Sequence, residues 1–126
     1  MKLKEAFDLK FQSTAKQLTS QKLRIKAAVT LALAIEKLEA EMNRFNKIKM
    51  ETIQKYAEKD SDGKLLSNED GTMKLSPEDQ TMIEAQLVEM VETEIEIPTV
   101  KASDLGEDVT LSVEELLLLK GLVTFT

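Results

Sequence analysis

One stretch of sequence decides the fold: residues 22–59, which read KLRIKAAVTLALAIEKLEAEMNRFNKIKMETIQKYAEK. Apolar side chains recur in it at alternating steps of four and three residues, a spacing that lines one helix face and resembles a coiled-coil seam. We therefore expect one long helix, on the order of 50 Å at the usual rise per residue, which should protrude or pair with another chain. The interaction seam consists of Leu31, Ile35, Leu38, Met42 and Phe45.

A shorter amphipathic helix is expected before this stretch, from about residue 4 to residue 18. Its apolar positions lie about four residues apart, as the inner face of a helix requires. These positions are Leu3, Phe7, Phe11 and Leu18. Residues 19–21 should form the break, and the Ser20 hydroxyl should accept from the free amides at the start of the long helix.

The segment 58–69 allows more than one interpretation. With Glu58 as the first position, it places oxygen ligands at the spacing of an EF-hand calcium loop. However, Glu stands where Asp is usual, and the turn pair Asp70-Gly71 follows where an EF-hand needs a helix. Together with Asp62-Gly63, this pair favours a small β-hairpin over residues 60–75, and an irregular loop remains an alternative.

Helix signals return after this segment. Ser76-Pro77-Glu78-Asp79 offers a capping hydroxyl, a proline at the first helical position and acids in the first turn, so a helix is expected from there to about residue 92. Residues 94–97 alternate as a half-buried edge strand does. Ser112-Val113-Glu114-Glu115 predicts a capping box before a short helix. We expect the β-prone residues 122–125 to pair with 94–97.

The charge of the chain is divided between its two halves. Residues 1–57 carry 12 Lys/Arg against 6 Asp/Glu, whereas residues 58–126 carry 5 against 17. A helix over 76–92 that returns along the long helix would place acids opposite lysines.

Together, these features predict a mainly α architecture of one domain: an elongated antiparallel helical hairpin with a β-hairpin at its tip and a minor terminal β element. Its parts are a basic helical half (1–59), the Asp-Gly hairpin (60–75) and an acidic half (76–126).

Composition excludes several kinds of chemistry. The chain has no Cys and no His, so it lacks disulfides, thiolate metal sites and the side chain most used for proton transfer near neutral pH. No glycine-rich phosphate loop is present, and the acids do not mark a convergent pair, so we expect no enzyme and no cofactor. Glutamates among the lysines argue against direct nucleic-acid binding. Without a long apolar run, we expect no membrane partner and a cytoplasmic protein.

The order of these features resembles a family of small uncharacterised phage and prophage proteins. The features are a short N-terminal helix, the entry Gln-Lys-Leu-x-Ile-Lys at residues 21–26, the stretch 55–64, the Asp-Gly hairpin, residues 94–97 and the closing Ser-x-x-Glu helix. The resemblance covers most of the chain and supplies no catalytic residues. It implies a viral source, with the host cytoplasm as location, and a role in particle assembly or in managing the host cell.

Two functions are compatible with this pattern. The first is a non-enzymatic interaction or assembly module that binds itself, as a homo-oligomer, or another protein through the seam of the long helix, with contacts that survive high salt. The second is an acidic inhibitor whose surface from Glu58 to Glu115 imitates phosphates and occupies a basic groove of a host nucleic-acid-binding or defence protein. Binding of the second kind should weaken steeply with salt.

Overall fold

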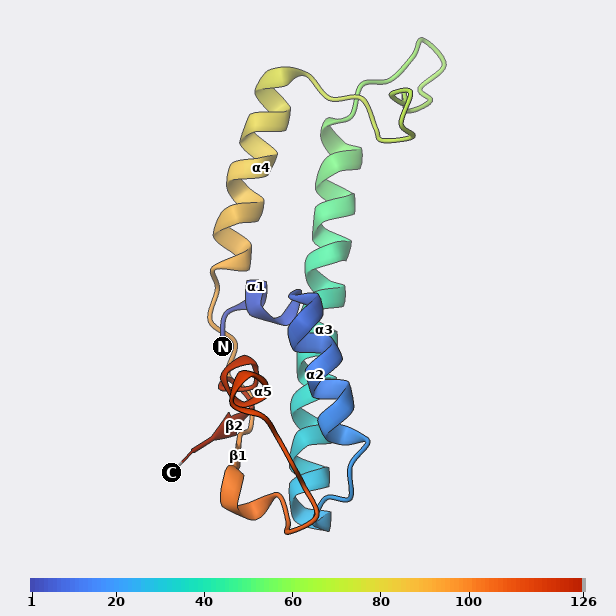
Figure 1. The fold of residues 1–126 in the computed structure, drawn as a ribbon. Coiled ribbons are helices and arrows are strands. Elements are labelled where there is room, and N and C mark those ends of the chain that lie inside the picture. The colour runs from blue at the N-terminus through green and yellow to red at the C-terminus, as the bar shows by residue number, and fades with distance from the viewer. Residues whose placement is uncertain (126) are drawn as a thin grey trace. The chain divides into compact units, whose positions relative to one another are not determined.

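The computed structural model describes residues 1–125 and is mainly helical, with five α-helices, one short 3-10 helix and one two-stranded sheet among these residues (Figure 1). The chain divides into two compact units. The first unit combines residues 1–42 with residues 93–125, and the second comprises residues 43–92. Helix α3 (Ile25–Tyr56) contributes to both units.

The prediction of one long helix is confirmed by α3, which is continuous over 32 residues. The segment is rich in Ala, Leu, Glu and Lys and contains neither Gly nor Pro, so nothing in it interrupts the helix. It begins three residues later than expected and ends three residues earlier. At its start, the amide of Arg24 donates to the carbonyl of Leu105 at 3.0 Å, which fixes the residue before the helix outside it.

The predicted helix over residues 4–18 is in fact two helices, α1 (Leu3–Ala6) and α2 (Leu9–Thr19). Asp8 is the reason for the break, because its carboxylate accepts from the amides of Lys10 at 2.8 Å and Phe11 at 3.4 Å and so starts a new helix. The expected role of Ser20 is wrong. Ser20 ends α2, and its hydroxyl donates back to the carbonyl of Gln17 at 2.7 Å.

The first unit contains a small parallel sheet of β1 (Val100–Lys101) and β2 (Val123–Thr124), in which Val100 faces Val123. The predicted partner of the C-terminal strand was residues 94–97, and this pairing is wrong. Residues 93–95 bind the N-terminus instead, because the amide of Leu3 donates to Thr93 at 3.0 Å and that of Ile95 donates to Met1 at 2.7 Å.

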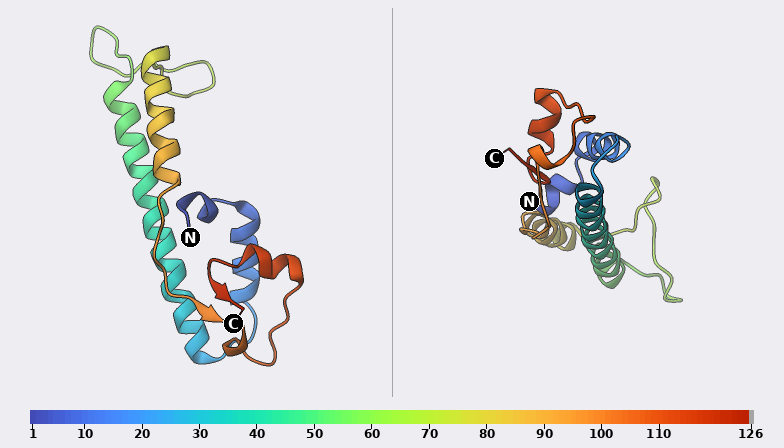
Figure 2. Two further views of the ribbon diagram at one scale, coloured as in Figure 1. Left: turned by 90° about the vertical axis from the view of Figure 1, so that its left-hand side faces the viewer. Right: turned by 90° about the horizontal axis from the view of Figure 1, so that it is seen from below.

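Helix α5 (Val113–Leu118) follows the 3-10 helix η1 (Ala102–Asp104) and contacts α2 within the first unit (Figure 2). The predicted capping box is confirmed: the Ser112 hydroxyl accepts from the Glu115 amide at 3.1 Å, and the Glu115 carboxylate accepts from the Ser112 amide at 3.1 Å. Fully buried side chains from α2, α3 and the C-terminal segment form the core of this unit: Leu18, Leu31, Leu119, Leu122 and Val123.

The second unit contains the C-terminal part of α3 and helix α4 (Pro77–Val91), which lie side by side in Figures 1 and 2. As expected, the Ser76 hydroxyl caps α4 by accepting from the Asp79 amide at 3.1 Å, with Pro77 in the first turn. Phe45 and Ile83 are buried here, at 9% and 3% exposed.

Among the described residues, no helix is both long enough and apolar enough to pass through a bilayer.

The segment between α3 and α4 makes two tight turns. Gly63 and Gly71 have φ of 82° and 85°, which explains why both turns carry Gly after Asp. Isolated antiparallel bridges, Lys59 with Leu65 and Ser67 with Met73, stand where the β-hairpin over residues 60–75 was predicted. No regular strand is assigned between residues 57 and 76.

Candidate interaction surface

The structure turns the predicted interaction seam inward. Leu31, Leu38 and Phe45 are buried, at 1%, 4% and 9% exposed, and Ile35 and Met42 are half-buried. The first four seam residues after the start of α3 belong to the first unit, whereas Phe45 belongs to the second. The seam therefore does not act as one open strip, because most of its area is already covered by the chain itself.

Helix α2 lies beside the seam in the first unit. An open cavity of about 400 Å³ is lined from the α2 side by Phe11 and Ala15, and from the α3 side by Ile35, Leu38 and Met42. Lys16 and Glu39 also line it. Ile35, Leu38 and Met42 of the expected binding face thus lie across this cavity from α2, within the same unit.

A second face of α3 is also apolar, and it is open. Ile25, Val29 and Leu33 are 84%, 53% and 54% exposed, and they follow one another at steps of four residues along the helix. Two small exposed residues, Ala28 and Ala32, complete this face. We call the set the outer stripe: Ile25, Ala28, Val29, Ala32 and Leu33.

The outer stripe was not predicted from the sequence, because the alternating spacing of four and three residues outlines a single apolar face of the helix. The available signal was the run 27–35, nine successive residues without a charge. Such a run makes a helix apolar on all sides, and a helix of that kind is normally covered all round. Here only the inner side is covered.

A shallow groove borders the outer stripe. It measures about 350 Å³ and is lined by Thr19 at the end of α2, by Leu23 of the connection before α3, and by Ala28, Ala32 and Ile35 of α3. The alanines leave room above the helix backbone, so the groove can accept a branched aliphatic side chain. The stripe and the groove together form a surface with both projections and hollows.

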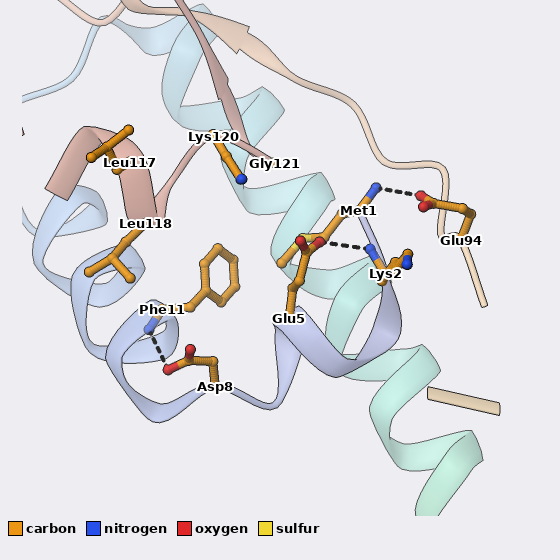
Figure 3. Close-up of a pocket in the computed structure, with 10 residues that line it drawn as sticks. All are labelled: Met1, Lys2, Glu5, Asp8, Phe11, Glu94, Leu117, Leu118, Lys120 and Gly121. Carbon is orange, nitrogen blue, oxygen red and sulfur yellow. Dashed lines mark hydrogen bonds and ion pairs between the residues drawn. The ribbon is translucent and has the colours of Figure 1, made fainter. Parts of the chain in front are cut away.

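A second cavity of the first unit is lined by three carboxylates, those of Glu5, Asp8 and Glu94 (Figure 3). It measures about 530 Å³, and the ring of Phe11 points into it. Its carboxylates already have partners: Glu5 accepts from the Lys2 amide at 2.8 Å, and Glu94 pairs with the N-terminal ammonium of Met1 at 3.1 Å.

The third carboxylate, Asp8, caps α2 as described above. All three acids thus hold chain segments in place, and the arrangement offers capping and ion pairing rather than a free acid and base.

Two acids of the loop over residues 58–69 have partners within the structure. The Oδ1 atom of Asp60 accepts from the amides of Asp62 and Lys64, both at 2.9 Å, so this carboxylate closes its own turn. Glu58 pairs with Lys74 at 3.7 Å. Within residues 1–125, no group of three or more acidic, His or Cys side chains is arranged to hold a metal ion.

Comparison with known proteins gives no relative for this chain: no protein-family model, no curated protein and no solved structure matches it.

Proposed function

We propose that this protein is a non-enzymatic interaction or assembly module that binds another protein molecule through α3. The observation that carries the proposal is the outer stripe, where Ile25, Val29 and Leu33 are each more than half exposed. Val29 and Leu33 lie on the run 27–35, which carries no charge. Contiguous apolar surface of this kind on a small protein marks a binding surface.

The size of the stripe supports a binding role. Its three large side chains together expose roughly 350 Å², within the range of the functional patches found on small proteins. At about 25 cal/mol per Å², covering this area would contribute about 9 kcal/mol before the costs of association are subtracted. This gross contribution is similar in size to the cost of association, so the stripe can supply a large part of the binding free energy of a partner.

Other parts of the proposal concern architecture and setting. We place the C-terminal part of α3 and α4 in an antiparallel helical hairpin joined by the Asp-Gly turns, a view supported by their positions side by side in the second unit. The resemblance to small phage proteins and the cytoplasmic location stay predictions. The lack of a catalytic role is supported by the capping and pairing roles of Glu5, Asp8 and Glu94.

Site-specific photo-cross-linking tests the binding role. A benzophenone amino acid replaces Leu33, and the labelled protein is irradiated in an extract of cells that make the protein naturally. Leu117 on α5, 61% exposed, is the matched control position. We expect adducts with protein at position 33 that persist in about 1 M salt, where ionic contacts are screened. Equal or lower yield at position 33 than at position 117 would refute the proposal.

An acidic inhibitor is the second candidate, and α4 favours it. This helix and its C-terminal cap carry the acids Glu78, Asp79, Glu84, Glu89 and Glu92 and no Lys or Arg. Glu78, Glu84 and Glu89 are exposed. If this surface imitates phosphates, a benzophenone at Val88, which is 61% exposed on α4, should give adducts that disappear as salt is raised.

A further inference from the structure

We propose that the outer stripe binds a second copy of this chain, with the two α3 helices antiparallel about a two-fold axis that passes between Val29 and Ala32. This inference rests on the proposed binding role of α3 and names the partner. The contact lies entirely within the first unit. It uses the exposed face of α3 and leaves the inward seam in place.

Large and small residues on the stripe are arranged to fit a copy of themselves. With the axis between Val29 and Ala32, Val29 lies over the partner's Ala32, and Leu33 lies over the partner's Ala28. Val29 and Leu33 therefore each meet an alanine, next to the groove that Ala28 and Ala32 line. Small residues let two helix backbones approach closely, and alternation of large and small residues fills the space between them.

Charge selects the antiparallel direction. Residues 22–26 contain Lys22, Arg24 and Lys26 and no acid, and the uncharged run 27–35 follows. Residues 36–41 then contain three glutamates against one lysine. An antiparallel pair places each basic end against the partner's acidic end. A parallel pair would place like charges together at both ends.

Exposure shows that the charged side chains are available for this contact. Lys26, Glu36 and Glu39 are all exposed, on the turns that flank the stripe. In the proposed register, Lys26 reaches the partner's Glu36, and Lys22 approaches the partner's Glu39. Ile25 lies over the aliphatic stem of the partner's Glu36, which keeps its carboxylate in solvent.

The area available predicts a reversible dimer. The outer stripe and the charged side chains beside it would bury roughly 500 Å² on each copy, about 1,000 Å² in total, at the lower limit for a specific interface. We therefore expect a dissociation constant in the micromolar range rather than a permanent assembly. The dimer should form as the protein is concentrated and dissociate on dilution.

Sedimentation equilibrium of the full chain measures how its average mass changes with concentration. Between about 1 μM and about 1 mM, the average mass should rise from 14.2 kDa toward twice that value. Val29→Glu should weaken dimerisation at least tenfold, because it places a charge at the centre of the contact. Val88→Glu, at a helical position of similar exposure in the second unit, should leave the dissociation constant unchanged.

Charge exchange tests the register. At low salt, Lys26→Glu and Glu36→Lys should each weaken self-association several-fold, because each places like charges at both ends of the antiparallel pair. An equimolar mixture of the two variants should dimerise as tightly as the unchanged protein, because every contact then joins opposite charges. The double variant should do the same.

Several results would overturn this inference. They are a monomer up to about 1 mM, an equal effect of Val29→Glu and Val88→Glu, or no recovery in the mixture of charge variants. In the cross-linking experiment, an adduct at position 33 with a different protein, found together with a strictly monomeric chain, would refute self-association but leave the binding role of α3 intact. A monomer without any adduct at position 33 would refute both.

Discussion

Replacing Leu18 by Ala should destabilise the first unit far more than the same replacement at Leu9 of the same helix. Leu18 is 0% exposed, whereas Leu9 is 78% exposed. Loss of three buried carbon groups at about 0.8 kcal/mol each gives ~2.4 kcal/mol, and the cavity left behind raises this toward ~3 kcal/mol. Leu9→Ala loses about a fifth of the transfer energy and creates no cavity, so ~0.5 kcal/mol is expected.

Urea unfolding followed by circular dichroism measures this difference. With a slope of about 1.5 kcal/mol per molar urea, Leu18→Ala should lower the unfolding midpoint by about 2 M and Leu9→Ala by less than about 0.5 M. Tyr56 is the single tyrosine and lies in the second unit, so its fluorescence reports that unit separately. A difference between the two variants below about 1 kcal/mol would refute the assignment of Leu18 to the core.

Three further changes have defined outcomes. Asp8→Ala should lower the free energy of unfolding by about 1 kcal/mol through loss of the α2 cap, whereas Asp8→Asn should keep most of it; equal losses in urea unfolding would contradict this role. Hydrogen bonds from the Thr72 hydroxyl and amide hold the pKa of Asp70 below its ordinary value, so its small stabilising contribution should be lost as pH falls below about 4. Thr72→Val should raise that pKa in a carboxyl NMR titration, and an unchanged pKa would exclude the hydroxyl as its cause. Calcium at about 1 mM should not raise the melting temperature, because Asp60 already closes its own turn; a rise of several degrees would establish a site in residues 58–69.

The helices that the sequence predicted correctly have strong local signals. Ser76 with Pro77 and Ser112 with Glu115 each combine a cap and its partner within four residues, and the structure forms both caps. The long helix was predictable because α3 contains no residue that interrupts it. These features depend on neighbours in sequence, so periodicity and capping rules suffice to find them.

The wrong strand pairing involves contacts between residues that are distant in sequence. Residues 93–95 pair with the N-terminus, and Val123 pairs with Val100, but no local pattern specifies which strand-like segment meets which. The break at Asp8 had a local cause, since Asp is a good N-cap, but the regular spacing of Phe7 and Phe11 suggested one helix. For the interaction surface, sequence indicated an apolar α3, and burial was needed to show which face remains open.

The order of segments in the first unit constrains when it can form during synthesis. Its sheet joins Val100 to Val123, and its N-terminal residues bind residues 93–95, so its two sequence parts are separated by the whole second unit. The second unit, residues 43–92, is continuous in sequence and emerges completely before the first unit does, so it can fold while translation continues. The first unit can close only after Val123 has emerged. Until then, its N-terminal helices expose the apolar residues that later form the core, which makes the nascent chain a candidate for chaperone binding.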